Sequence, residues 1–262
     1  MKQYIVDAFT ERLFAGNPAA VVPCTVMPSP ELMQNIAIEN NYSETAFVVK
    51  TDEGHYDLKW FTPGGEIDLC GHATLATAFV LHEFVDKGLK KMHFHTLSGE
   101  LVVTVSEDGF TLDFPIGKTK PIPITDTILK ATNGLAKEAY YDDGDMVVVI
   151  ENESDLVSFV PEGELIKALD GLGFIMTAQS AHCDFVSRCF YPKLNVLEDP
   201  VTGRAHTFMA PIWTQKLGKE VLHAKQLSKR GGAMTVQCKG DRVYLTGKAQ
   251  LFMEGEIFVN AE

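Results

Sequence analysis

Glu44 and Asp199 are two carboxylates whose sequence neighbours suggest acid–base chemistry. Glu44 stands in Ser-Glu-Thr-Ala-Phe, directly before an apolar segment, and Asp199 stands in Glu-Asp-Pro-Val-Thr-Gly, before a turn into a helix. Two carboxylates at one substrate can serve as acid and base when burial raises their pKa values toward neutrality. An ordinary interpretation also fits, in which Glu44 is a solvated residue at a strand start and Asp199 caps a helix.

Each half of the chain also has a glycine at which a turn opens a helix. Gly71 begins Gly-His-Ala-Thr-Leu, and Gly203 begins Gly-Arg-Ala-His-Thr. The first N–H groups of such a helix have no partner within the helix and can bind an anion such as a carboxylate. His72 can relay a proton there, and Arg204 can add positive charge. A well-formed helix start with no ligand, and a structural histidine, give the same pattern.

Cys70 places a thiol directly before the first of these helix starts. Such a thiol can have a depressed pKa and act as a base or nucleophile. A two-thiol racemase would need a second cysteine at the matching turn, where Thr202 stands, so we expect Cys70 to be a small packing residue. The candidate ligands lack the close spacings of zinc motifs, and no nucleotide-binding or Gly-x-Ser-x-Gly motif occurs. We therefore expect neither a metal nor a cofactor.

The elements that hold these residues occur twice in the sequence. Three pairs of landmarks recur in the same order at separations of 132 (203 − 71), 132 (231 − 99) and 127 (184 − 57) residues: Gly71 with Gly203, Gly99 with Gly231, and Asp57 with Asp184. Each copy has the pattern of strand, turn, strand, small-residue turn, helix and hairpin. The sequence predicts an α+β protein with mostly antiparallel pairing. Its lobes are residues 1–117 and 118–262, divided near the proline-rich segment 115–123, and the last residues can pack back on the first lobe.

The composition limits the partners that this chain can bind. It has 262 residues, 45% of them hydrophobic and 22% charged, which is ordinary for a globular protein. A net charge of −12 argues against nucleic acid or an anionic membrane, and favours a small molecule. Five cysteines without a CxxC pair, no signal-peptide pattern and no apolar run of about 18 residues predict a cytoplasmic protein.

The combined motifs resemble the PhzF-like family of phenazine-biosynthesis isomerases. The segments that carry this resemblance are spread along nearly the whole chain: 7–10, 14–19, 43–47, 70–74, 187–192, 198–203 and 226–232. The resemblance implies the diaminopimelate-epimerase-like fold, in which two similar lobes each wrap a sheet around a central helix. It also implies an active site between the lobes, no cofactor, a small anionic substrate and a homodimer.

The resemblance assigns roles to the motif residues. Glu44 corresponds to the base that takes a proton from a ring carbon and returns it elsewhere on the ring, while Asp199 and His72 match the other polar positions. Ser43, Gly71 and Gly203 are implied to bind substrate. A single base on one face suits isomerisation better than epimerisation, which needs groups on both faces. The family usually has Ser where this chain has Arg204, which either adds positive charge to the pocket or points to solvent.

Two other functions remain open from the sequence. A racemase or epimerase that uses Cys70 and a carboxylate would lose activity when the thiol is alkylated and keep it in Glu44→Gln. A binding protein that kept the scaffold without catalysis would bind acids and exchange no proton with them.

Overall fold

The computed structural model describes residues 1–142 and 144–259, which form two compact α+β units. The N-terminal unit contains Met1–Asp113 and the chain from Thr246 onward, and the C-terminal unit contains Phe114–Leu245. The first boundary falls just before the proline-rich segment at which the sequence predicted a division. Within the described residues, no helix is both long enough and apolar enough to cross a membrane.

The N-terminal unit is a mixed sheet with two helices. Its strands are β1 (Lys2–Ala8), β2 (Asn17–Cys24), β3 (Glu44–Asp52), β4 (His55–Thr62), β5 (Gly65–Ile67), β6 (Lys91–Thr96), β7 (Gly99–Ser106), β8 (Gly109–Pro115) and β18 (Ala249–Glu256). The pairings are antiparallel except for β2 with β3 and β4 with β6. Helix α1 (Pro30–Asn40) begins at the predicted cap, where the Ser29 side chain accepts a hydrogen bond from the Leu32 N–H.

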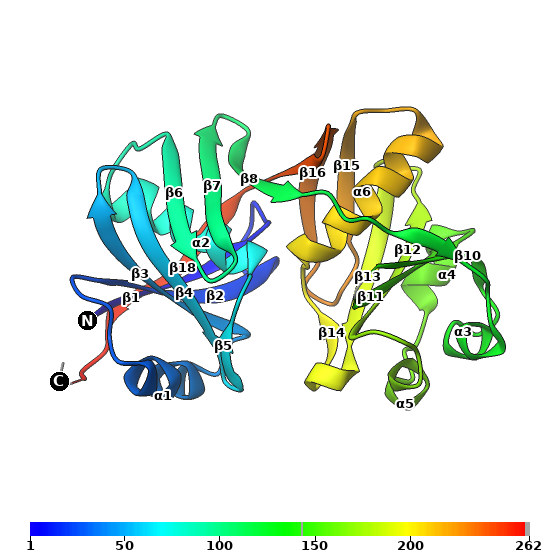
Figure 1. The fold of residues 1–262 in the computed structure, drawn as a ribbon, viewed down its shortest axis with the longest axis horizontal. Coiled ribbons are helices and arrows are strands. Elements are labelled where there is room, and N and C mark those ends of the chain that lie inside the picture. The colour runs from blue at the N-terminus through cyan, green and yellow to red at the C-terminus, as the bar shows by residue number, and fades with distance from the viewer. Residues whose placement is uncertain (143, 260–262) are drawn as a thin grey trace. The chain divides into compact units, whose positions relative to one another are not determined.

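Helix α2 (Gly71–Val80) is the centre of the N-terminal unit. Most of its residues are buried, and it packs against β1, β2, β3 and β18 (Figure 1). A helix that is apolar on all sides has to be enclosed by other elements. The sequence Ala-Thr-Leu-Ala-Thr-Ala-Phe-Val meets this requirement, and a short π-helix, η1 (Leu81–Val85), continues it. The sheet therefore fixes the start of α2 in a buried position.

The C-terminal unit has the same kind of core around helix α6 (Gly203–Leu217), which packs on β11, β15 and β16 (Figure 1). Its strands are β9 (Lys120–Ile122), β10 (Ala136–Asp142), β11 (Asp145–Ile150), β12 (Gly173–Gln179), β13 (Phe185–Tyr191), β14 (Val196–Asp199), β15 (Val221–Gln226), β16 (Gly232–Lys239) and β17 (Arg242–Gly247). Short helices α3 (Asp126–Ala131), α4 (Glu153–Ser158) and α5 (Gly163–Lys167) and the 3-10 turn η2 (Pro192–Leu194) complete it.

The two units share one topology, which confirms the predicted repeat. In the first, β2 pairs parallel with β3, β3 antiparallel with β4, and β4 both antiparallel with β5 and parallel with β6. Strands β11 to β15 repeat this series in the same order, and α6 follows β14 as α2 follows β5. The extra residues of the second copy lie between Pro192 and Gly203, where η2 is found.

The register identifies equivalent positions in the two units. The third residue of β2 pairs with Glu44, and the third residue of β11 pairs with Ile175. Thr45, which follows Glu44, pairs with Phe61, and Met176, which follows Ile175, pairs with Arg188. Glu44 therefore corresponds to the buried Ile175, and Phe61 corresponds to Arg188.

Candidate active site

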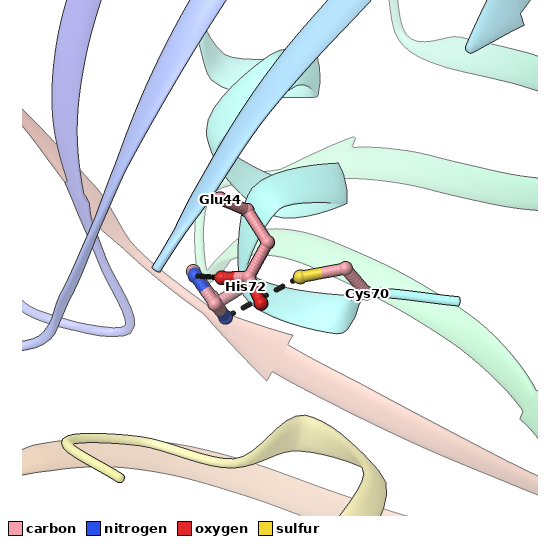
Figure 2. A group of neighbouring side chains, drawn as sticks. All are labelled: Glu44, Cys70 and His72. Atoms are coloured by element: carbon pink, nitrogen blue, oxygen red, sulfur yellow. Dashed lines mark hydrogen bonds and ion pairs between the residues drawn. The ribbon is translucent and has the colours of Figure 1, made fainter. Parts of the chain in front are cut away.

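Glu44 and His72 form a close pair inside the N-terminal unit (Figure 2). Glu44 is the first residue of β3, and His72 is the second residue of α2. The Nε2 atom of His72 lies 2.9 Å from Oε2 of Glu44, and the side chains are 7% and 14% exposed. Both atoms are buried, and neither has an aligned hydrogen-bond partner among the described residues. Glu44 is thus no solvated strand-start residue, and the pair retains hydrogen-bonding capacity that a substrate can use.

The other nitrogen of His72 faces Asn17 and Cys70. Its Nδ1 atom lies 3.3 Å from the amide nitrogen of Asn17 and 3.5 Å from Sγ of Cys70. As oriented, the amide donates to Nδ1, which places the proton of a neutral ring on Nε2, facing Glu44. The oxygen and nitrogen of the amide can exchange places, so the Asn17 oxygen can also accept a hydrogen bond from Nδ1 of the protonated ring. The sequence gave Asn17 no role of its own; it stood only within segment 14–19 of the family resemblance, as the polar residue that opens the apolar strand β2.

The charges around His72 hold a proton on its ring. Burial by itself lowers the pKa of His72, but the charges of Cys70 and Glu44 raise it by more, to well above its ordinary value of 6.5. Burial raises the pKa of the Cys70 thiol, and the charge of Glu44 adds to that rise. Cys70 and Glu44 together therefore hold the proton on His72.

Neither helix start is closed by a side-chain cap. Cys70 before α2 and Thr202 before α6 both have extended backbones and make no side-chain hydrogen bond to the first helical turn. In the N-terminal unit, Gly71 opens the helix and the half-buried Ser43 directly precedes Glu44. The structure thus brings Ser43, Glu44, Gly71 and His72 into one unit at the start of α2.

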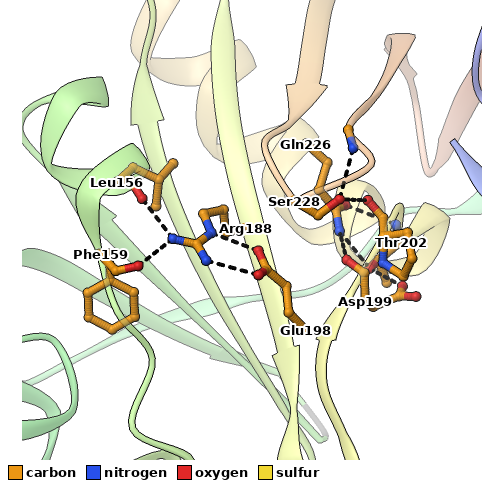
Figure 3. A network of polar contacts seen from close by, with 10 residues as sticks. Leu156, Phe159, Arg188, Glu198, Asp199, Thr202, Gln226 and Ser228 are labelled. Atoms are coloured by element: carbon orange, nitrogen blue, oxygen red, sulfur yellow. Dashed lines mark hydrogen bonds and ion pairs between the residues drawn. The ribbon is translucent and has the colours of Figure 1, made fainter. Parts of the chain in front are cut away.

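Asp199 belongs to a hydrogen-bonded segment of the C-terminal unit (Figure 3). Its carboxylate accepts a hydrogen bond from the Thr202 hydroxyl, and its carbonyl accepts one from Gln226 Nε2 at 2.8 Å. Gln226 also accepts from the Thr202 N–H at 2.9 Å, and the Ser228 hydroxyl donates to the carbonyl of Pro200 at 2.8 Å. Gln226 and Ser228 thus hold the turn before α6. The sequence marked them only as part of a motif.

Glu198, the neighbour of Asp199, has a different task. Arg188 binds it through two hydrogen bonds, Nε to Oε1 at 2.7 Å and Nη2 to Oε2 at 2.9 Å. The third guanidinium nitrogen donates to the carbonyls of Leu156 at 3.1 Å and Phe159 at 2.6 Å (Figure 3). The acidic pair is therefore divided: Glu198 ties β14 to β13 through Arg188, whereas the Asp199 carboxylate contacts the turn before α6.

Arg204 is anchored within the C-terminal unit. Its Nε donates to Oδ2 of Asp145 at 2.9 Å, and its guanidinium lies 5.5 Å from the centre of the Phe208 ring. The side chain is 53% exposed, whereas that of Asp145 is 3% exposed. Burial raises the pKa of Asp145, and the charge of Arg204 opposes that rise. Arg204 therefore compensates a buried carboxylate while about half of its side chain stays exposed.

His206, two residues further along α6, differs sharply from His72. It is fully buried, and its Nδ1 lies 2.8 Å from the carbonyl oxygen of Thr202. Burial lowers its pKa to about 4, although the Thr202 carbonyl acts in the opposite direction. His206 is therefore a neutral residue at pH 7 that donates to the turn before the helix.

Glu44 and His72, together with Cys70, are also possible metal ligands. One ligand atom from each of Glu44, Cys70 and His72 lies within 4.8 Å of the others. Spacing along the sequence did not indicate this group, because Glu44 comes from a strand and the other two from a helix start. A thiolate, an imidazole and a carboxylate suit a borderline metal such as Zn²⁺. These residues can thus hold a cation as well as transfer protons.

Comparison with known proteins establishes the class of this chain. Residues 6–255 match the PhzC-PhzF family, described as phenazine biosynthesis-like protein, so the chain belongs to this family. It is 46% identical over 252 residues to an uncharacterized isomerase of Pseudomonas aeruginosa, with 96% of each protein covered. The resemblance predicted from the motifs is confirmed, and the chain is an enzyme of the isomerase class.

Solved structures confirm the predicted fold as well. The crystal structure of a PhzF-family phenazine biosynthesis protein from Enterococcus faecalis matches with a TM-score of 0.94 at 46% identity, covering 98% of this chain and 99% of that one. A probable proline racemase from Agrobacterium radiobacter K84 matches with a TM-score of 0.66 at 11% identity, covering 99% and 93%. The second likeness shows the fold alone, which is the diaminopimelate-epimerase-like arrangement of a sheet around a central helix.

Proposed function

We propose that this protein is a cofactor-independent isomerase that moves a proton on a small carboxylate, with Glu44 as the base. The observation that carries the proposal is the buried contact of Glu44 with His72, 2.9 Å apart, in which neither atom has an aligned hydrogen bond. The curated relative from Pseudomonas aeruginosa is named an isomerase, which supports the reaction class.

The proposed mechanism uses one carboxylate for both proton transfers. Ionised Glu44 removes a proton from a carbon whose charge the substrate delocalises, and the same carboxylic acid returns it at another carbon. His72, 2.9 Å away, holds the Glu44 carboxylate in place for both transfers. Backbone N–H groups at Gly71 and the hydroxyl of Ser43 bind the anionic part of the substrate.

The C-terminal unit supplies the second set of groups in this proposal. Asp199 serves as a further acid or base, and Gly203 and Arg204 bind the negative charge of the substrate. The Asp199 carboxylate is oriented by Thr202, which in turn is held by Gln226. Asp199→Asn should lower turnover while leaving the Glu44 and His72 pair intact.

The test is NMR-detected incorporation of deuterium from D₂O into cyclic and amino-substituted carboxylic acids. Glu44→Gln should lower incorporation by roughly 10²- to 10⁴-fold, the usual contribution of a positioned base. Glu39→Gln is the matched control, because it removes an exposed carboxylate from α1 and should leave the rate unchanged. A Glu44→Gln variant that melts like the wild type and exchanges at the same rate would overturn the proposal.

A racemase that uses Cys70 is the second candidate, because Sγ of Cys70 lies 3.5 Å from Nδ1 of His72. The raised pKa of the buried thiol disfavours it. Cys70→Ser should keep deuterium incorporation if Glu44 is the base and abolish it if the thiol is. Binding of an acid without any incorporation would instead identify a binding protein.

A further inference from the structure

A second group of side chains of the types that bind metals lies on one face of the N-terminal sheet, on β4, β6 and β7. His55 on β4 is the direct parallel partner of His93 on β6, so both side chains leave the sheet on the same face. Glu100 on β7 pairs with His95, which lies two residues after His93 and so on that face too. Their sequence neighbours Tyr56, Phe94 and Leu101 alternate with them and are buried in the core.

The contacts within this group leave a histidine nitrogen uncommitted. The His55 and His93 rings are stacked, with centroids 4.7 Å apart and planes 16° apart. Nδ1 of His93 lies 3.3 Å from Oε1 of Glu100, yet it is buried and has no hydrogen-bond partner among the described residues. A buried nitrogen without a hydrogen bond costs stability unless a ligand satisfies it. The lone pair of a neutral imidazole nitrogen is what a metal ion takes up.

The distances fit a metal ion. One ligand atom from each of His55, His93 and Glu100 lies within 4.8 Å of the others. Tetrahedral zinc with ligands at about 2.0–2.1 Å holds them roughly 3.4 Å apart, so small side-chain rotations complete the site. We propose that His55, His93 and Glu100 bind a divalent transition-metal ion, Zn²⁺ by preference, with water in the open position.

The chemistry of the ligand set selects the metal. Two imidazoles and one carboxylate suit zinc and its neighbours in the first transition row, whereas calcium and magnesium prefer sites built from oxygen. The exposed His95 packs its ring 6.0 Å from His55 and can serve as an additional ligand. The bound ion would join three strands on a face that contains none of the residues at the start of α2, so the proposal is independent of the acid–base function.

The test is calorimetric titration of the metal-stripped full-length protein with zinc chloride. Losing even an outer-shell partner weakens metal binding about 10- to 100-fold, so His55→Gln and His93→Gln should each weaken this site at least tenfold. His182→Gln, at an exposed histidine of the C-terminal unit, is the matched control and should bind zinc as the wild type does. Cys70→Ser separates this site from the thiol group at the start of α2 and should also retain it.

Two spectroscopic measurements keep the test independent of how the variants fold. Zinc should shift the imidazole NMR signals of His55 and His93 in the wild type, and cobalt at this site should show no thiolate charge-transfer absorption. The proposal fails if the wild type binds no zinc, if His55→Gln and His93→Gln bind it unchanged, or if zinc leaves both imidazole signals in place.

Discussion

The starts of α2 and α6 occupy the same place in one repeated topology, yet they carry different polar groups. The second residue of α2 is His72, which contacts Asn17 at the start of β2. The second residue of α6 is Arg204, which binds Asp145 at the start of β11. Each unit therefore has a polar contact between the first residue of a strand and the second residue of the helix, and both partners differ between the units.

The strand beside each helix start has also diverged. Glu44, which faces His72, corresponds to the apolar Ile175, so the C-terminal unit lacks a carboxylate at that position. Phe61 packs its ring edge-on against Phe47 at 5.9 Å, whereas Arg188 at the equivalent position holds a bidentate contact to Glu198. The comparison teaches that the scaffold fixes positions, while the residues placed there decide which unit carries a titratable pair.

Removing the charge of Arg188 should have the largest effect on stability. Arg188→Met leaves Glu198 and two carbonyls without their donors and should cost about 3–5 kcal/mol of unfolding free energy. Urea unfolding, followed by Trp213 fluorescence in a Trp60→Phe background, measures this in the C-terminal unit. Lys167→Met breaks an exposed pair with Glu164 and should cost at most about 1 kcal/mol.

The double variant Arg188→Met with Glu198→Leu sharpens this comparison. It makes the site apolar, as at Phe61, and should recover much of the lost stability because a buried ion pair is often replaceable by packed apolar groups. If the single and double variants lose the same unfolding free energy, the Arg188–Glu198 ion pair stabilises the fold by more than the cost of burying its two charges.

His206 should make the stability of the C-terminal unit depend on pH. Its pKa of about 4 lies below the ordinary value of 6.5, so the unfolded chain binds a proton that the folded chain rejects. The folded state is fully favoured above pH 6.5 and loses roughly 3 kcal/mol as the pH falls toward 4. Urea midpoints measured across this range should depend less on pH in His206→Gln, and exposed His223→Gln should keep the wild-type dependence.

Arg204→Ser should have a smaller effect, which tests the second polar contact. The change removes the charge that compensates buried Asp145, so unfolding free energy should fall by about 1 kcal/mol at pH 7. Because protonated Asp145 needs no cation, the loss should shrink at low pH. Arg204→Lys keeps the charge and should retain part of the stability. Urea unfolding at pH 7 and pH 4 measures both variants. Equal losses of unfolding free energy in Arg204→Ser and Arg204→Lys at pH 7 would contradict the role of the charge.

The histidine pKa values themselves give the finest test of the comparison. His72 should remain protonated above pH 6.5, and its contribution to stability should be lost as the pH rises through its own raised pKa. Glu44→Gln should lower the pKa of His72 and leave that of His206 unchanged, as measured by NMR titration of the imidazole signals. A pKa of His72 that is equal in the wild type and the variant would show that Glu44 does not raise it.

Local patterns in the sequence were enough for the elements and for the family. The cap at Ser29, the alternation of Leu101 and Val103 along β7 and the repeat of Gly71 at Gly203 each depend on a few neighbouring residues. The family motifs named Glu44, His72 and Asp199 as site residues, because chemistry and turn geometry constrain short segments. The start of α1 and the repeated order of elements were therefore predictable.

Tertiary structure alone decided what each polar residue does. His72 and His206 both stand in the first turn and a half of a buried helix, but their pKa values shift in opposite directions. The cause is their surroundings: Cys70 and Glu44, the latter from a distant strand, raise the pKa of His72, whereas burial lowers that of His206. The sequence by itself determined which groups are present and where elements begin; folding decided which charges become neighbours, because electrostatic partners are set by distance in space and not along the chain.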